Sequence, residues 1–205
     1  KEVKEAVHSA VPKEAGITTI ELEGPEVSIY NSNTAAFHEN EGYVREIAHR
    51  LKKKVNIRAD KSLLIDEKKA KEKILEIVPK EAEISDIQFM EPFSEVMIEA
   101  MKPGLVIGKG GETTKKIIIE TGWTPRIVRA PTSPSEILKG IRHHLVKYAG
   151  ERKKYMIEAA KKIYSEKAQP SWIRITPLGG FRQVGRSCIL VETRRTKILL
   201  DCGIN

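Results

Sequence analysis

The residues of this sequence with the clearest chemical potential lie in a glycine-rich loop. Four residues, Gly108-Lys109-Gly110-Gly111, separate a short apolar segment from an amphipathic run that begins at Glu112. Glycine lets the backbone approach a ligand closely, and the unpaired N–H groups of a helix's first turn favour an anion. Positive charge is added by Lys109, Lys115 and Lys116. The loop therefore predicts contact with phosphate.

The spacing of the glycines argues against two common nucleotide-binding loops. A P-loop needs four residues between its glycines followed by Lys and Ser or Thr, and a dinucleotide-binding fold needs a third glycine in a Gly-x-Gly-x-x-Gly pattern. Neither spacing occurs around Gly108. We interpret the loop as a contact to a nucleic-acid backbone, and Arg126 and Arg129 of the following strand are further candidates for RNA binding. A glycine-rich helix cap with incidental lysines remains the alternative.

Charge is unevenly distributed along the 205 residues, whose net charge is +8. The formal charge is −5 over residues 1–101, +9 over 102–167 and +4 over 168–205. The positive surplus begins at the loop, which places the electrostatic footprint for nucleic acid there. The lysines of 139–167 also fit the solvated faces of long helices.

Composition predicts a cytoplasmic protein. No apolar run approaches the ~20 residues of a membrane span, and the first residues have no signal-peptide pattern. The only cysteines, Cys188 and Cys202, are too few for a disulfide framework and lack metal-ligand spacing.

An internal repeat organises the first two thirds of the chain. Residues 11–17 recur at 78–84, an offset of 67, and residues 26–29 recur at 95–98, an offset of 69. Each repeat is predicted to contain a helix, two strands, the loop with its helix, and a last strand. The predicted elements are 2–11, 17–23, 26–31, 43–53 and 55–59 in the first repeat, and 67–78, 84–90, 94–101, 112–121 and 125–130 in the second.

The first repeat has lost the glycine loop. Adding 69 to residues 39–42 gives 108–111, so Glu-Asn-Glu-Gly stands where the second repeat has Gly-Lys-Gly-Gly. Two carboxylates would repel phosphate, so we do not expect direct clamping by the first repeat. Packing against the second repeat or contact with a protein partner are the alternatives. The basic residues of 50–54 and Arg58 fit either an electrostatic contact to RNA or a solvated helix end.

The loop, its apolar-faced helix and the strand 126–129 resemble the KH family of RNA- and single-stranded-DNA-binding domains, whose Gly-x-x-Gly loop holds a stretch of nucleic-acid backbone. The order helix-strand-strand-helix-helix-strand, with the loop between the paired helices, is what this resemblance identifies as type II. KH domains hold bases in an aliphatic groove, so apolar residues near the loop are candidates for groove or for core: Val106, Ile107, Ile127 and Val128. Trp123 is expected to be a core residue between helix and strand.

After Pro131 the pattern becomes helical. Ser133-Pro134-Ser135-Glu136 has the form of a capping box with proline at the first helical position. Apolar residues continue one face from 137 to 163, which fits two helices or one kinked helix. The adjacent His143 and His144 cannot chelate as an i, i+4 pair would, so we expect them to face solvent.

The last part of the chain turns to β character. Residues 172–180 precede a predicted hairpin of 187–192 and 196–200, which ends in Asp201-Cys202-Gly203. Three segments, 175–180, 184–188 and 198–203, closely resemble the opening strands of the metallo-β-lactamase fold in its β-CASP nuclease branch. Two KH domains before such a nuclease are the arrangement of the archaeal homologues of the cleavage and polyadenylation specificity factor. The chain is identified as the N-terminal portion of such a protein.

This resemblance implies an activity for a longer protein. It implies two zinc ions, a His-x-His-x-Asp-His ligand cluster, and endonuclease and 5′–3′ exonuclease cleavage at RNA 3′ ends during transcription termination. The cluster is absent from this sequence, so we expect neither catalytic residues nor a cofactor in it; Asp201 matches an aspartate beside the metal site. Gln183 stands where much of the branch has an acidic residue. Single-stranded RNA and RNA polymerase are implied partners, with a homodimer through the C-terminal region.

The fold predicted is therefore α+β. It comprises a KH-like domain at 1–62, a KH domain with an intact loop at 63–131, a helical connector at 132–169, and at 170–205 the first hairpin of a metallo-β-lactamase αββα domain. Two alternatives stay open: a stand-alone tandem-KH factor that binds RNA without chemistry, and a connector that docks a protein.

Overall fold

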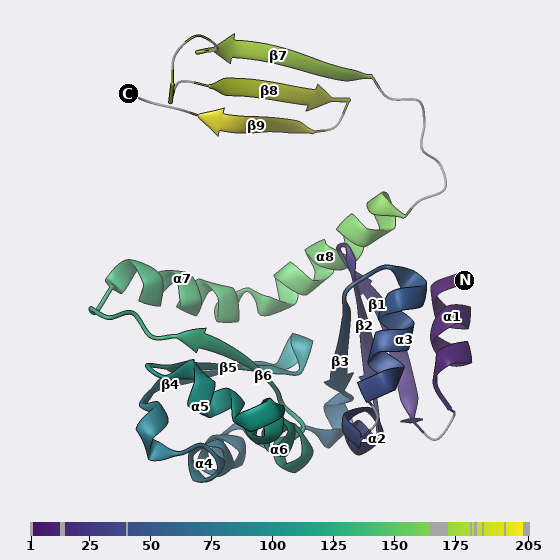
Figure 1. Cartoon of the computed structure of the whole chain (residues 1–205), viewed down its shortest axis with the longest axis vertical. Coiled ribbons are helices and arrows are strands. Elements are labelled where there is room, and N and C mark those ends of the chain that lie inside the picture. Colours follow the sequence, from purple (N-terminus) through teal and green to yellow (C-terminus); the bar gives the residue numbers. More distant parts are fainter. Residues whose placement is uncertain are drawn as a thin grey trace. The chain divides into compact units, whose positions relative to one another are not determined.

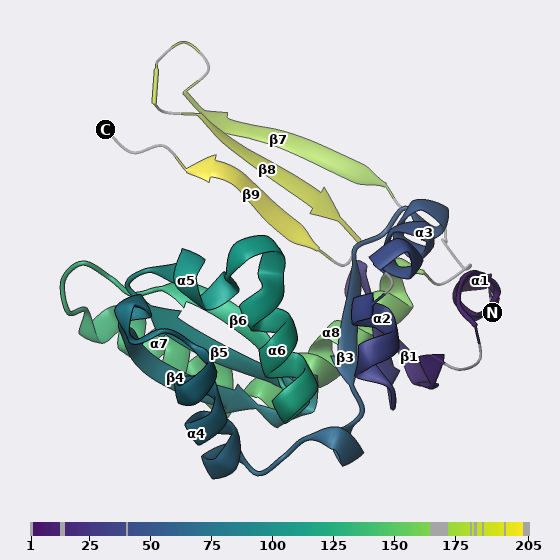
Figure 2. The same cartoon turned by 60° about the horizontal axis from the view of Figure 1, so that its bottom comes forward.

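A computed structural model describes residues 2–12, 15–39, 41–164, 172–180, 182, 184–185, 187–194 and 196–202. The chain divides into two compact units, residues 1–163 and 164–205. The first unit contains both sequence repeats and the helical connector (Figures 1 and 2). The second is a small sheet.

The first repeat is a three-stranded sheet covered by helices. Its sheet has the order β1-β2-β3, with β1 antiparallel and β3 parallel to the central strand. Val7, Val27, Ile29 and Ile47 are fully buried between helices and sheet and form the centre of the core. The elements are α1 (Glu2–Ala10), β1 (Ile17–Glu23), β2 (Glu26–Asn31), α2 (Thr34–Glu39), α3 (Glu41–Leu51) and β3 (Val55–Ala59).

The second repeat has the same topology. Its sheet has the order β4-β5-β6, again with one antiparallel and one parallel neighbour of the central strand. The elements are α4 (Glu67–Ile77), β4 (Ile84–Met90), β5 (Glu95–Ala100), α5 (Pro103–Ile107), α6 (Glu112–Thr121) and β6 (Thr124–Arg129). In both repeats the strands and longer helices match their predicted bounds closely, and the largest shift is in α3, which lies slightly earlier than predicted. The short helices α2 and α5 were not among the predicted segments.

Period-two alternation on β5 and β6 gives the second sheet two buried faces. Ile98 and Ile127 pack in the core beneath α4, α5 and α6, whereas Met97 and Val128 belong to a smaller cluster on the opposite face. Ala149 of the connector packs into this smaller cluster. Figure 1 shows the connector helices on the side of the sheet away from α4 and α6. The sheet is therefore sandwiched between two helical layers.

The connector consists of two helices, α7 (Glu136–Lys147) and α8 (Ala149–Ile163), which meet at Tyr148. The prediction of a cap at Ser133 is wrong: α7 begins at Glu136, and the hydroxyl of Ser135 accepts a hydrogen bond from the Leu138 N–H at 3.3 Å. Ser135 is the residue in extended conformation directly before the helix, where an N-cap must lie. Pro134 therefore precedes the cap.

A buried ion-pair network joins the two repeats. The Arg58 guanidinium, at the end of β3, donates through Nη1 to both carboxylate oxygens of Glu23 at 2.7 Å and through Nη2 to Glu95 of the second repeat at 2.7 Å. Burial disfavours the charged guanidinium, but the carboxylates of Glu95 and Glu23 raise the pKa of Arg58 above its ordinary value. Tyr30 and Lys153 extend the network to α8, since the Lys153 ammonium donates to the Tyr30 hydroxyl at 2.9 Å.

The second unit is a three-stranded antiparallel sheet of β7 (Ile173–Gly179), β8 (Cys188–Thr193) and β9 (Lys197–Cys202). The predicted hairpin corresponds to β8 and β9, and β7 adds a third strand to it. Asp201 has a φ of +55° and accepts a hydrogen bond from the Ser187 hydroxyl at 2.6 Å. Gln183 lies outside the described residues.

Candidate nucleic-acid interface

The glycine loop connects the two helical segments that precede β6 in the second repeat. α5 ends at Ile107, Gly108 turns the chain, and a single 3₁₀ turn over Lys109–Gly111 leads into α6. Three of the loop residues have a left-handed backbone, with φ values of +75° at Gly108, +61° at Gly110 and +80° at Gly111. Residues other than glycine rarely adopt such angles, so the sequence of the loop is dictated by its backbone.

Gly108 is also required by close packing. A Cβ atom built there would lie 2.2 Å from the Thr113 Oγ1 and 2.9 Å from the Thr113 backbone nitrogen. At Gly110, by contrast, a Cβ atom would meet nothing within 4 Å. The first glycine is therefore structural, whereas Gly110 stands open to a ligand.

The first turn of α6 presents backbone N–H groups at this loop. Its N-cap is Gly111, which has no side chain to accept from the first turn. The Glu112 N–H donates to the Lys109 carbonyl and the Gly111 N–H to the Gly108 carbonyl, the latter at 3.2 Å. The ten-residue helix α6 thus begins without a side-chain cap, an arrangement that favours an anion.

The predicted cations differ in their surroundings. Lys109 is exposed at the tip of the loop. Lys115 is half-buried and already interacts with other groups of the protein. The Lys116 ammonium lies 3.8 Å from the Glu120 carboxylate, one turn further along α6. Arg129 is exposed at the end of β6. Lys109 is therefore the charge best placed for a ligand at the loop.

Arg126 lies on the other face of the sheet from the loop helices. It alternates with Ile127, which packs beneath those helices, and it borders a hollow that is also lined by Arg152 of α8. The structure therefore separates Arg126 from the loop, although both belong to the predicted RNA-binding set. The alternation of side chains along a strand could have assigned Arg126 to this face from the sequence alone. The position of α8 could not be predicted in this way.

The apolar candidates separate into groove and core. Ile107 is 44% exposed directly before the loop, and Leu105 on the same short helix is 39% exposed. Val106 between them is fully buried, Ile127 is partly buried against the same core, and Val128 faces the connector. Ile107 and Leu105 are thus the apolar side chains that α5 leaves open beside the loop.

Trp123 is a core residue, as predicted. It is 2% exposed, its indole N–H donates to the Ile65 carbonyl at 2.9 Å, and its ring meets Phe89 edge-on with centroids 4.8 Å apart. It is therefore closed to a base. In the connector, His144 is exposed and stacks on Tyr148.

The corresponding segment of the first repeat has a different backbone. α2 ends at Glu39 and α3 begins at Glu41, so Gly42 lies inside a helix. Asn40 and the side chains of Glu39 and Glu41 lie outside the described residues. The expectation that this repeat does not clamp phosphate remains a prediction.

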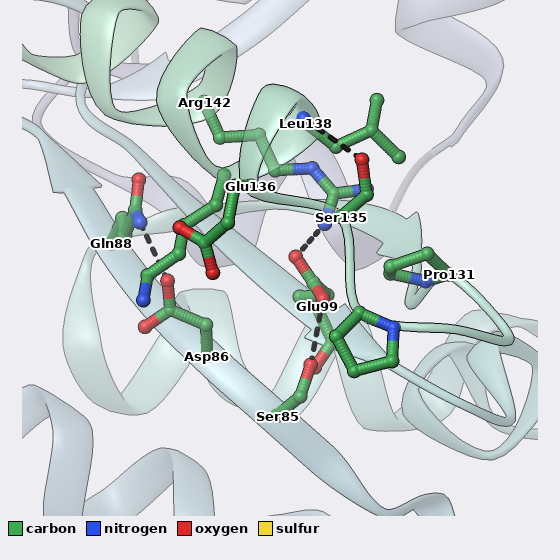
Figure 3. Close-up of a pocket in the computed structure, with 11 residues that line it drawn as sticks. Ser85, Asp86, Gln88, Glu99, Pro131, Ser135, Glu136, Leu138 and Arg142 are labelled. Carbon is green, nitrogen blue, oxygen red and sulfur yellow. Dashed lines mark hydrogen bonds and ion pairs between the residues drawn. The ribbon is translucent and has the colours of Figure 1, made fainter.

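A hollow of about 410 Å³ beneath α7 is lined by three carboxylates, Asp86, Glu99 and Glu136. Figure 3 shows Arg142 reaching from α7 to Glu99 of β5, with which it forms an ion pair. Because its arginine is already paired and its carboxylates would repel phosphate, this hollow does not suit RNA.

The described residues offer neither a metal site nor a membrane span. They contain no group of three or more His, Cys, Asp or Glu side chains that could hold a metal ion. Within the same part of the chain, no helix is both long and apolar enough to cross a bilayer.

Comparison with known proteins identifies relatives along the whole chain. The family described as "Transcription termination factor FttA, KH domain" matches residues 1–64. Proteins named "Transcription termination factor FttA" are 45% identical over 206 residues in Methanothermobacter thermautotrophicus and 44% identical over 206 residues in Thermococcus kodakarensis. Each match covers 100% of this chain and 32% of the relative. The chain therefore spans about a third of the length of the curated relatives it matches.

A solved structure titled "Crystal structure of APE1850" covers 63% of this chain and 96% of its own, at 17% identity and a TM-score of 0.29. That score is too low to assign a shared fold.

Proposed function

We propose that this chain, which is related to the archaeal transcription termination factor FttA, is the part of such a protein that binds single-stranded RNA. The observation that carries the proposal is the loop of the second repeat. It combines a left-handed glycine backbone, an uncapped ten-residue helix and the exposed Lys109. These features together suit a phosphodiester backbone.

In this proposal the loop positions the strand and the neighbouring surface holds its bases. Backbone N–H groups at the start of α6 and the Lys109 ammonium contact phosphates, which carry no sequence information. Ile107 and Leu105 offer apolar contacts to bases. Discrimination between bases would therefore come from the groove beside α5 and not from the loop.

We further propose that the two repeats are tandem type II KH domains and that β7–β9 begins a metallo-β-lactamase domain. Support for the latter comes from the exposed apolar side chains of the sheet, such as Ile173 at 68%, Ile175 at 66% and Leu199 at 49%. Such side chains are normally covered by further layers of a domain. A cytoplasmic location, a homodimer and proximity to RNA polymerase belong to the same proposal.

The whole protein is proposed to be a zinc-dependent β-CASP endo- and 5′–3′ exoribonuclease that cuts RNA 3′ ends during transcription termination. The described residues of this chain do not fit a zinc site, so the metal would be held by residues outside them. The full-length protein should cleave RNA in a chelator-sensitive way, while this chain alone should bind RNA without cleaving it. A full-length protein that binds RNA but never cleaves it would instead be a binding factor without chemistry.

RNA binding is tested by fluorescence anisotropy with a U-rich single-stranded RNA of about 12 nucleotides, long enough to span several phosphate contacts. Lys109→Asp/Gly110→Asp should weaken binding at least about tenfold, because two carboxylates replace the cation and the open glycine. The fold should survive, since a side chain at Gly110 meets no neighbour and Asp tolerates a left-handed backbone.

The matched control is Lys68→Asp/Lys71→Gln on the exposed side of α4, which changes the net charge by the same amount. Equal losses in the two variants would mean that only net charge matters. Unchanged binding by the loop variant would move the site to the connector or to the first repeat.

A further inference from the structure

The junction between the two repeats contains a second polar hollow, of about 460 Å³. It is lined by residues of β3, of the start of β6 and of the helix α8. Besides carboxylates, its lining includes the polar side chains of Lys54, Asn56, Arg58, Thr124, Arg126 and Arg152. We call it the junction hollow.

Arg58 is a buried residue that lines this hollow. Its side chain is 5% exposed and held by Glu23 and Glu95, yet its Nε–H has no hydrogen-bond partner among the described residues. The Thr124 hydroxyl on β6 is also buried without a described partner. Buried polar groups are normally satisfied, so two unsatisfied ones beside the same hollow indicate a missing ligand or water.

The carboxylates around the hollow already lie beside cations. Glu23 and Glu95 pair with Arg58, and Glu26 accepts from the Lys54 ammonium at 3.0 Å and from the Asn56 amide at 2.8 Å. Because Glu23 and Glu95 share the single charge of Arg58, these three carboxylates and their two cations together carry a formal charge of −1.

Two arginines of the hollow, Arg126 and Arg152, have no carboxylate partner in the described ion pairs. Arg126 is exposed on β6. Arg152 donates to the Leu145 carbonyl at 3.0 Å and lies over the Phe93 ring, with its guanidinium carbon 5.3 Å from the centroid. With these two arginines the formal charge of the lining is +1, and guanidinium groups bind phosphate oxygens in a bidentate way.

We propose that the junction hollow binds a phosphate group through Arg126 and Arg152. The phosphate is carried either by a single-stranded RNA that also contacts the glycine loop or by a free diphosphate. The RNA source rests on the proposed function, whereas the anion site itself does not. Because Arg126 faces away from the loop helices, an RNA strand that reaches both would pass around the edge of the second repeat.

The first arm of the test titrates inorganic pyrophosphate into the 205-residue chain, by calorimetry and by NMR of the arginine Nε–H groups. Arg126→Gln should weaken pyrophosphate binding about tenfold, since it removes a charge-assisted contact. Lys154→Gln, on the exposed side of α8, changes the charge equally and should leave the affinity unchanged.

The second arm measures RNA affinity against salt for the same variants, with and without Lys109→Asp/Gly110→Asp. If RNA supplies the phosphate, Arg126→Gln should make the log–log salt slope shallower by about 0.7 for the lost contact. An effect on pyrophosphate alone assigns the site to a free diphosphate and leaves RNA binding to the loop. Equal behaviour of Arg126→Gln and Lys154→Gln in both arms would overturn the proposal.

Discussion

At the scale of single residues, the first glycine of the loop has a different role from the open glycine two positions later. Gly108 is fixed by its φ of +75° and by its contact with Thr113, whereas a Cβ atom at Gly110 would meet no neighbour within 4 Å. A substitution at Gly108 therefore tests folding, and one at Gly110 tests binding.

We expect Gly108→Ala to lower the free energy of unfolding by about 1–3 kcal/mol, because it adds a strained left-handed residue and a clash with Thr113. Gly104→Ala is the matched control, since Gly104 lies in α5, has no positive φ and meets nothing within 4 Å. It should be neutral or slightly stabilising. Urea denaturation of both variants measures the difference, and equal stabilities would contradict the assigned strain.

Much of the loop could be predicted from residue types, because glycine spacing reports backbone conformation directly. The sequence did not separate Val106 from Ile107, since adjacent apolar residues on a short helix look equivalent until the core beneath them is known. Arg126 was grouped with the loop although strand alternation places it on the face opposite Ile127. The hollow that it borders on that face could not be predicted, because the position of α8 depends on contacts distant in sequence.

At the scale of elements, α8 is docked on the first repeat by polar contacts. The Lys153 ammonium bonds to the Glu21 carboxylate at 2.8 Å and to the Tyr30 hydroxyl at 2.9 Å. Burial raises the pKa of Tyr30 above its ordinary value of 10.0. Burial lowers the pKa of Lys153, but its bonds to Glu21 and Tyr30 outweigh burial and hold the pKa above its ordinary value of 10.5.

Both groups hold their protons more tightly in the folded state than in the unfolded one. Their contribution to stability is therefore complete below about pH 10 and is lost as the pH rises through the folded-state pKa values. Tyr30→Phe should flatten this alkaline loss, as measured by denaturant midpoints between about pH 8 and 11. Tyr155→Phe, on the exposed side of α8, should keep the wild-type profile; a loss of the same slope in both variants would contradict this account.

The order of helices and strands could be predicted because the repeat appears twice. The pattern of one repeat supports the assignment of the same elements in the other. The resemblance implied a helix before the loop, but the bounds of the short helices α2 and α5 were not predicted, because segments so short cannot show a helical period. The cap of α7 was misplaced because Ser133 and Ser135 both suit an N-cap.

At the scale of the molecule, Arg58 joins the two repeats. Arg58→Ala should lower the free energy of unfolding by about 3–5 kcal/mol, because it leaves the 2% exposed Glu23 carboxylate without its cation. Lys54→Ala breaks the exposed pair with Glu26 and should cost at most about 1 kcal/mol. Chemical denaturation measures the free energy of unfolding of both variants. Similar losses in the two variants would show that the Arg58 network contributes little to stability.

This network had no recognisable signal in the sequence. Arg58 was attributed to a basic run that suited RNA or solvent, because Glu23 and Glu95 are 35 and 37 residues away along the chain. The charge imbalance along the sequence did indicate the second repeat and connector as the basic region. It could not indicate which arginines remain unpaired.

The measurement that tests the central claim most directly is the salt dependence of RNA affinity for the wild-type chain and for Lys109→Asp/Gly110→Asp. If the loop of the second repeat holds phosphates, the variant should bind weakly and with a shallower log–log salt slope, by about 0.7 for each lost contact. An unchanged affinity and slope would contradict the account, and the glycine loop would then be only a helix cap.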